Sequence, residues 1–190
     1  LITVSDSARK SLEEAGLKPR SFHVIHNGVD LEQFQPFVPD REGDEVHFAY
    51  PSRILPGKGQ HLAIDAVARL PRRYKQRATL TVVGSVVDSI FFDQLKVQAH
   101  EQPVRFATDV VEIASYYQQA DVVLFPTLLE EGFGFTAVEA MACGKPVIYF
   151  EQAAVREATG GLGIGVPRGD VDAMRDAIRE LMDDPQRREQ

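Results

Sequence analysis

Glu130-Glu131-Gly132-Phe133-Gly134-Phe135-Thr136-Ala137-Val138-Glu139-Ala140-Met141-Ala142-Cys143-Gly144-Lys145-Pro146 is the stretch that decides the fold. It lies between two short apolar runs, 121–126 and 147–150, which have the composition of buried parallel strands. Its glycines allow a tight turn and a close approach of the backbone to a ligand. The stretch therefore predicts a strand, a glycine turn, a helix over about 135–142 and a second strand.

The predicted helix would direct its first amides and the positive end of its dipole at the turn, which suits an anion or a ring of hydroxyls. Glu131 and Glu139 frame this turn, and carboxylate oxygens accept hydrogen bonds from sugar hydroxyls. A second interpretation needs no ligand. Thr136 and Glu139 have the spacing of a capping box, and an acid such as Glu131 is favoured near a helix start. These residues alone leave both interpretations open.

The rest of the chain alternates between strand and helix patterns. Apolar runs and helical stripes predict strands over 46–50, 78–84, 104–106 and 162–166, and helices over 61–70, 89–100, 110–119, 153–158 and 171–182. With the two strands beside the glycine turn, this gives about six strands. The alternation favours an α/β fold, a Rossmann-like parallel sheet with helices on both faces. Ligands of such sheets bind at the carboxyl ends of the strands.

The segment before the sheet has a different character. Ser5 can cap a helix that ends near residue 15, and 22–26 is a candidate strand. Residues 31–45 contain prolines and charges without periodicity, which is typical of a linker.

Two cations lie in the loop after the first strand of the sheet. Arg53 and Lys58 flank a tight turn that contains Pro56, Gly57 and Gly59, on the edge where the glycine turn is expected. Arg offers a planar fork of donors and Lys a point charge, so together they suit a diphosphate. Two solvated loop charges are the alternative. We expect no bound metal, so these cations would neutralise the diphosphate.

Length and composition limit the remaining possibilities. The chain has 190 residues, a formal net charge of −7 and a single cysteine, Cys143. This suits one α/β domain in a reducing, cytoplasmic setting, and the acidic balance argues against a nucleic-acid partner. No apolar run is long enough to cross a membrane. The first residues do not resemble a signal peptide and lack an initiator Met, so we expect an excised piece of a longer chain.

Glu131-Gly132-Phe133-Gly134-Phe135, followed by Glu139-Ala140-Met141-Ala142-x-Gly144-x-Pro146, resembles the donor-binding signature of the family-4 retaining glycosyltransferases, which have the GT-B fold. The resemblance covers nearly the whole chain, as the C-terminal half of such an enzyme. It implies that 1–45 is the tail of the N-terminal domain with the interdomain linker. Residues 46–190 would be the nucleotide-sugar donor domain, without the last helix that crosses back to the first domain.

The resemblance also implies roles for single residues. Arg53 and Lys58 would bind the nucleotide diphosphate, Glu131 the donor sugar and Glu139 the ribose, and Asp109 would lie in a loop that passes the base. The remaining donor-binding residues would be the turn itself: Gly132, Phe133, Gly134, Phe135 and Thr136. The implied reaction transfers a sugar from a UDP or GDP type donor with retention and without a cofactor. The isolated fragment would be inactive, because the missing N-terminal domain holds the acceptor.

Some features of the sequence depart from the family pattern. Glu151-Gln152-Ala153-Ala154 stands where the family often has a glycine pair. Two alternatives stay open: a stand-alone nucleotide-sugar binding module, and another GT-B-like enzyme such as a nucleotide-sugar epimerase. A dinucleotide-dependent oxidoreductase is disfavoured, because no Gly-x-Gly-x-x-Gly follows the first strand. The sugar, the base, the acceptor, the oligomeric state and peripheral membrane contact through the absent half are left undetermined.

Overall fold

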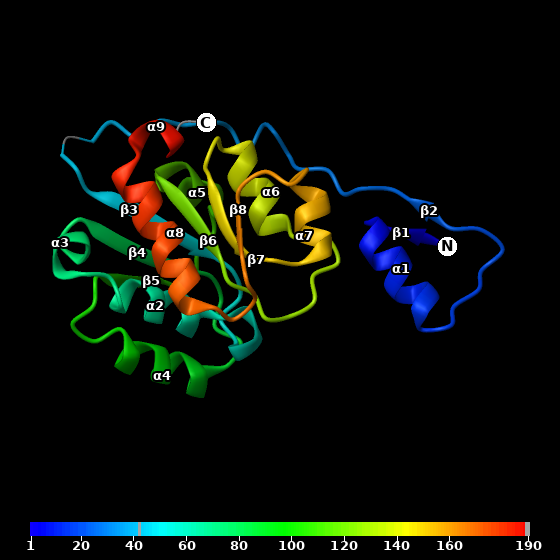
Figure 1. Cartoon of the computed structure of the whole chain (residues 1–190), viewed down its shortest axis with the longest axis horizontal. Helices are drawn as coiled ribbons and strands as arrows, with labels where there is room; N and C mark the ends of the chain where they lie inside the picture. Colours follow the sequence, from blue (N-terminus) through cyan, green and yellow to red (C-terminus); the bar gives the residue numbers. More distant parts are fainter. Residues whose placement is uncertain (42, 189–190) are drawn as a thin grey trace.

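A computed structural model describes residues 1–41 and 43–188. Its main body is one parallel sheet of six strands in the order β5-β4-β3-β6-β7-β8. The strands are β3 (Val46–Pro51), β4 (Ala78–Val83), β5 (Val104–Ala107), β6 (Val122–Phe125), β7 (Val147–Phe150) and β8 (Ile164–Val166). This confirms the predicted α/β sheet. The order reverses direction at β3 and β6, so the sheet has a switch point between these two strands (Figure 1).

Helices cover both faces of the sheet. α2 (Gln60–Ala68), α4 (Ser89–Gln98) and α8 (Val171–Asp183) pack together on one face, and α5 (Ala114–Gln119), α6 (Phe135–Ala142) and α7 (Ala153–Ala158) lie on the other (Figure 1). Three short elements complete this body: the 3₁₀ turn η1 (Pro56–Lys58), α3 (Arg72–Lys75) and α9 (Pro185–Arg188).

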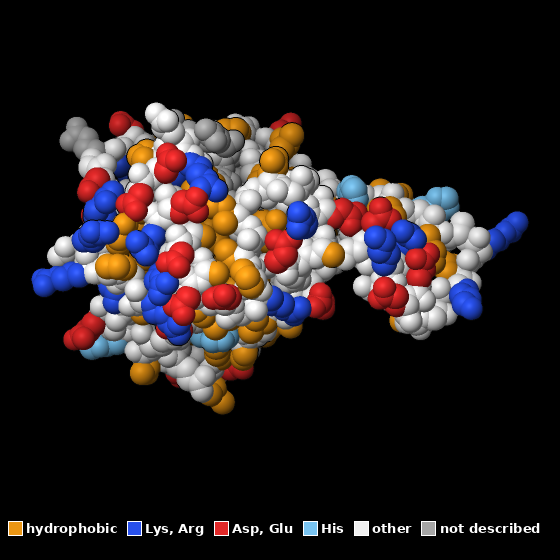
Figure 2. Space-filling view, viewed as in Figure 1, with side chains coloured by type: hydrophobic (Ala, Val, Ile, Leu, Met, Phe, Trp, Pro, Cys, Tyr) orange, Lys and Arg blue, Asp and Glu red, His pale blue; other side chains and the backbone are white. Residues whose placement is uncertain are grey.

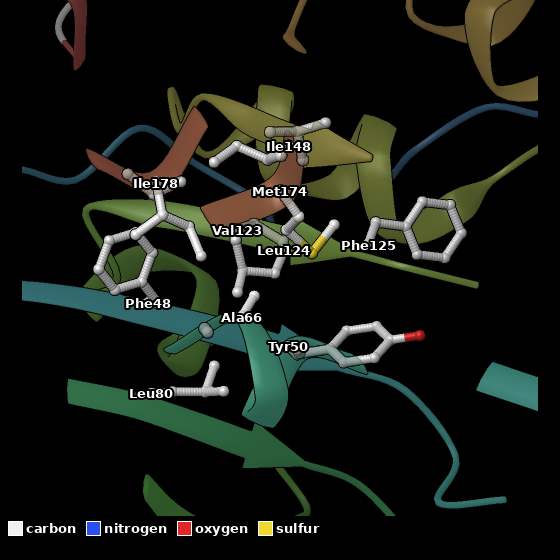
Figure 3. Packing of buried hydrophobic residues seen from close by; sticks show 14 of the residues in the cluster. Phe48, Tyr50, Ala66, Leu80, Val123, Leu124, Phe125, Ile148, Met174 and Ile178 are labelled. Carbon is white, nitrogen blue, oxygen red and sulfur yellow. The ribbon is translucent and has the colours of Figure 1, made fainter. Parts of the chain in front are cut away.

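The core lies between the two central strands and their helices. Phe48 and Tyr50 of β3, together with Leu124 of β6, are almost completely buried. Ala66 of α2 and Met174 of α8 pack over them from one face (Figure 3). Because both faces of the sheet are covered, the inner strands β6 and β7 are continuous buried apolar runs, which made them predictable.

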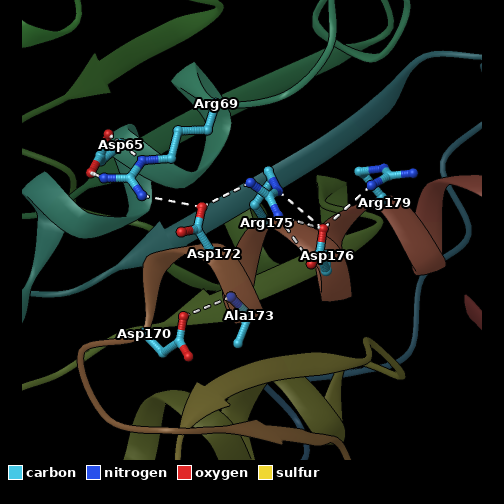
Figure 4. Close-up of polar contacts among 8 residues, drawn as sticks. All are labelled: Asp65, Arg69, Asp170, Asp172, Ala173, Arg175, Asp176 and Arg179. Carbon is cyan, nitrogen blue, oxygen red and sulfur yellow. Dashed lines mark hydrogen bonds and ion pairs between the residues drawn. The ribbon is translucent and has the colours of Figure 1, made fainter.

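Ion pairs join α2 and α8 at the surface. Arg69 pairs with Asp65 and Asp172, and Arg175 pairs with Asp172 and Asp176 (Figure 4). Figure 2 shows acidic and basic side chains interspersed over the region of α8. Exposed pairs of this kind contribute about 0–1 kcal/mol each. The late acidic residues therefore form a solvated, charge-balanced helix face.

The N-terminal residues form a small separate unit. β1 (Ile2–Thr3) precedes α1 (Asp6–Glu14) in the chain and β2 (His23–Val24) follows it, and the two strands pair in parallel. An extended segment then leads to β3 (Figure 1). Ser5 caps α1 as predicted, because its hydroxyl accepts a hydrogen bond from the Ala8 amide. In Figure 2 this unit is the smaller lobe beside the main one, and α1 contacts α7.

One predicted helix is shorter in the structure, and two short helices of the structure have no counterpart in the prediction. The helix expected over 110–119 begins only at Ala114, and 110–113 lie outside it. α3 and α9 were not predicted, because each is a single turn of 4 residues that is too short to show a periodic stripe.

Candidate functional site

The site lies at the carboxyl ends of β3 and β6, where the sheet order reverses. Two loops leave this edge, 52–59 after β3 and 126–134 after β6. The carbonyl of Gly57 accepts hydrogen bonds from the amides of Leu128 and Leu129, at 2.8 and 3.1 Å. These bonds hold the two loops side by side and make one continuous rim.

The loop after β3 has a conformation that only glycine accommodates at one position. Gly59 has a φ of +76°, and a Cβ atom there would lie 2.0 Å from the carbonyl oxygen of Pro126. The Tyr50 hydroxyl donates to the carbonyl of Lys58, and the Gln60 side chain donates to the carbonyl of Arg53 at 2.8 Å. The backbone that carries both cations is thereby fixed to the core and to the next loop.

Lys58 and Glu131 meet across the rim. The Lys58 Nζ atom lies 2.6 Å from Glu131 Oε1, and the side chains are only 13% and 16% exposed. The Thr127 hydroxyl donates to the same oxygen at 2.9 Å. The charge of the Lys58 ammonium is therefore partly neutralised. Within the described part of the chain, both hydrogen bonds to the Glu131 carboxylate end on Oε1.

A buried amide lies behind this pair. Gln152 is 6% exposed, and its Oε1 accepts from the Glu131 amide at 3.1 Å while its Nε2 donates to the Thr127 carbonyl at 3.0 Å. Neither Thr127 nor Gln152 belongs to a motif that predicts a role for it. The only signal was that Gln152 lies in the segment that departs from the family's glycine pair.

The glycine turn leads directly into α6. Gly134 is the N-cap residue, with a φ of +98°, and no side chain caps the helix. Thr136 instead donates its hydroxyl to the Pro51 carbonyl at 3.2 Å. The capping-box interpretation of Thr136 and Glu139 is therefore wrong, because neither side chain caps the helix. Within residues 1–41 and 43–188 the Ala137 amide bonds to the Gly134 carbonyl at 3.0 Å, so the Phe135 and Thr136 amides are the first ones left for a ligand.

Glu139 is held by an aromatic hydroxyl from the neighbouring helix. The Tyr117 hydroxyl of α5 donates to Glu139 Oε2 at 2.6 Å. Burial raises the pKa of Glu139 above its ordinary value, although the hydrogen bond from Tyr117 acts in the opposite direction. Tyr117 was not singled out in the sequence, because nothing in its spacing relates it to Glu139.

Other predicted site residues lie less centrally. Arg53 is exposed at the end of β3, and no carboxylate among residues 1–41 and 43–188 pairs with it. Asp109 is exposed after β5, which is separated from β3 by β4, and no recorded contact joins it to the other predicted residues. Phe135 is 47% exposed. The structure therefore brings Lys58 and Glu131 into contact, whereas no hydrogen bond or ion pair within residues 1–41 and 43–188 joins Asp109 to them.

Part of the glycine turn faces the N-terminal unit. The Gly132 carbonyl accepts a hydrogen bond from the Ser5 hydroxyl at 2.7 Å, and the buried Phe133 ring lies 6.2 Å from the His26 ring. Beside it, Glu157 of α7 accepts from the Asp6 and Ser7 amides at 2.7 and 3.0 Å.

Glu157 of α7 joins the main body to the N-terminal unit, and we call this contact the junction; the pKa of Glu157 is shifted. Its Oε1 also lies 2.9 Å from the His26 ring. Burial would raise the pKa of Glu157, but the two amides and His26 outweigh it and lower the pKa below its ordinary value. The ionised form of Glu157 is therefore the one that holds the junction.

Two further features of the described residues concern metal binding and membrane crossing. Asp170 and Asp172 have an Asp-x-Asp spacing, but Asp170 caps α8 at the Ala173 amide and Asp172 pairs with arginines. No group of three or more His, Cys, Asp or Glu residues that could hold a metal occurs within 1–41 and 43–188. In the same ranges, none of the helices combines the length and the apolar character required to cross a bilayer.

Comparison with known proteins identifies relatives of the whole chain. The family model described as Glycosyl transferases group 1 matches residues 45–184. A D-inositol 3-phosphate glycosyltransferase of Kineococcus radiotolerans is 32% identical over 99% of this chain and 50% of the relative. A protein of the same name from Kribbella flavida is 31% identical over 100% of this chain and 49% of the relative. The chain therefore spans about half the length of these curated relatives.

Solved structures of two other proteins are also similar to nearly the whole of this chain. HepE of Anabaena, in complex with UDP and glucose, is 25% identical with a TM-score of 0.86, over 99% of this chain and 55% of HepE. A sucrose-phosphate synthase of Thermosynechococcus elongatus is 26% identical with a TM-score of 0.82, over 99% of this chain and 50% of the synthase.

Proposed function

Because the chain belongs to the group 1 glycosyl transferase family, we propose that it is the donor-binding half of a retaining glycosyltransferase that uses a nucleotide-diphosphate sugar. The observation that carries the proposal is the pair of Lys58 and Glu131 at the switch point, 2.6 Å apart and mostly buried. A cation for a diphosphate and a carboxylate for sugar hydroxyls are thus adjacent on one rim.

In this proposal the donor lies along the rim. Lys58 and Arg53 bind the diphosphate, aided by the first amides of α6. Glu131 binds hydroxyls of the sugar, Glu139 those of the ribose, and the loop of Asp109 passes the base. The UDP bound to HepE supports a uridine nucleotide as the first donor to test.

The proposed reaction breaks the bond between the anomeric carbon and the diphosphate oxygen. The electron pair leaves with the diphosphate, and Lys58 and Arg53 stabilise this charge in place of a divalent metal. The acceptor hydroxyl would come from a substrate held by the other half of the protein; its oxygen bonds to the anomeric carbon, and its proton passes to the departing diphosphate. The chain's length relative to its relatives is consistent with such a second half.

The test uses the full-length protein that contains this chain. UDP, GDP, ADP and NAD are titrated by calorimetry, and release of nucleoside diphosphate is measured from UDP-glucose, UDP-N-acetylglucosamine, GDP-mannose and ADP-glucose. We expect binding of one nucleoside diphosphate and its release from the matching sugar. Binding without release in the presence of any acceptor would favour the stand-alone binding module, and binding of NAD alone would contradict the proposal.

Lys58→Ala tests the central cation. Losing one pre-placed charge-stabilising group typically lowers the rate by about 10² to 10³, and we expect a loss of this size. Lys96→Ala is the matched control, because Lys96 is an exposed residue of α4 that pairs with Asp93 and lies over the Phe92 ring, within its own helix. Near-wild-type release by Lys58→Ala would contradict the role of Lys58.

A further inference from the structure

Gln152 lies at the N-cap of α7, yet its side chain makes no hydrogen bond to that helix. Residues at this position usually direct a short polar side chain back to the helix amides. Gln152 instead reaches the loop after β6, where it contacts the Glu131 amide and the Thr127 carbonyl at 3.1 and 3.0 Å. Both ends of its buried amide therefore serve the neighbouring loop.

The two residues that Gln152 holds also contact each other. The Thr127 hydroxyl donates to Glu131 Oε1 at 2.9 Å, and Lys58 reaches the same oxygen at 2.6 Å. Thr127, Glu131 and Gln152 thus form a closed ring of hydrogen bonds. Within a buried ring of this kind each bond restrains the others, so the Glu131 backbone and its carboxylate are fixed together.

We propose that Gln152 is a positioning residue for Glu131. Its amide fixes the turn from Thr127 to Glu131, so that one carboxylate oxygen binds Lys58 and Thr127 and the other faces the donor sugar. This inference rests on the proposed function of Glu131. A displacement of about 1 Å at a reacting site can lower a rate about 10²-fold, so a rigid support for this carboxylate has a direct effect on transfer.

Gln152→Met in the full-length protein tests the proposal, because Met keeps the length of the side chain and removes both hydrogen bonds. Loosening Glu131 frees Lys58 for a diphosphate. We therefore expect about two- to fivefold tighter binding of UDP, the equivalent of one hydrogen bond. Release of nucleoside diphosphate from the preferred nucleotide-sugar should fall about 10- to 10²-fold. A merely structural role would weaken binding and release together, and that result would overturn the proposal.

Gln98→Met is the matched control. Gln98 also donates to a backbone carbonyl, that of His61 at 2.8 Å, but it is exposed at the end of α4 and makes no recorded bond to Thr127 or Glu131. It should change neither UDP binding nor release. Equal behaviour of Gln152→Met and Gln98→Met would overturn the role of Gln152.

A double-mutant cycle tests whether Gln152 acts through Glu131. In a Glu131→Gln background, adding Gln152→Met should lower release less than about twofold, because the group that Gln152 positions is already changed. The same loss in both backgrounds would overturn the proposal.

If Gln152→Met does not fold, Gln152→Glu replaces it. This variant keeps an acceptor for the Glu131 amide and loses the donor to Thr127. We expect release about threefold or more below wild type, and wild-type release would overturn the proposal. A wild-type protein that binds none of the nucleotides would instead contradict the proposed function itself, and this inference with it.

Discussion

Replacing Glu131 by Gln should have opposite effects on two ligands. The change keeps the shape of the side chain and its bond from Thr127, but it removes the negative charge 2.6 Å from Lys58. Exposed ion pairs contribute about 0–1 kcal/mol and breaking buried ones costs about 3–5 kcal/mol. Because these side chains are 13% and 16% exposed, we assign about 1–2 kcal/mol to the pair.

That free energy becomes available to a bound diphosphate when Glu131 is neutral. The full-length Glu131→Gln protein should therefore bind UDP roughly 5- to 30-fold more tightly than wild type by calorimetry. Release of UDP from UDP-glucose should fall about 10- to 100-fold, because charge-assisted hydrogen bonds to the sugar are lost.

Glu130→Gln is the matched control for this prediction. It makes the same change in net charge one residue away, where the exposed carboxylate pairs with Arg168 and not with Lys58. Its UDP affinity should stay within twofold of wild type. Unchanged or weaker UDP binding by Glu131→Gln would refute the reasoning, because Lys58 would then not be restrained by Glu131.

Three further predictions concern stability. Burial raises the pKa of Glu139, so the folded state binds the carboxyl proton more tightly than the unfolded state does, and the protein loses stability as pH rises from the ordinary carboxyl pKa through the raised one. Glu139→Gln should therefore raise Tm at pH 7. It should leave Tm unchanged at a pH below the ordinary carboxyl range. The pKa of Glu157 is lowered, so the stability that its carboxylate contributes is present above the ordinary carboxyl pKa and is lost as pH falls through the lowered value. Glu157→Gln should therefore speed the hydrogen exchange of the α1 amides at pH 7. The same exchange rates as in the wild type would contradict this. Gly59→Ala should lower the free energy of unfolding by more than the about 1–3 kcal/mol typical of backbone strain alone, because the added Cβ would meet the Pro126 carbonyl. Gly16→Ala is the control, since Gly16 has a similar φ of +87° but open space around it. Equal unfolding midpoints of the two variants in urea would contradict the clash.

The strands and the main helices could be predicted because their signals are local. A buried strand such as β7 is a continuous apolar run, and α6 is bounded by the glycines at 134 and 144. The late start of the helix predicted from 110 could not be foreseen. Its N-cap residue, Ile113, makes no side-chain capping bond, so no residue type in the sequence marks this boundary.

The candidate site was predicted only in part. Lys58 and Glu131 each lie in a recognisable motif, and the parallel topology brings the two motifs to one edge. The residues that hold Glu131 and Glu139 in place were missed. Gln152 and Tyr117 come from other elements than the glutamates they contact, and Thr127, in the same loop as Glu131, has no spacing that marks its contact. A motif therefore identifies the groups that would touch a ligand, and the fold is needed to find their supports.

A structure of the full-length protein with UDP-glucose bound tests the account most directly. It should show the diphosphate within about 3 Å of Lys58, a sugar hydroxyl on Glu131 and the ribose on Glu139. A nucleotide bound away from the ends of β3 and β6, or a diphosphate held without Lys58, would contradict the account.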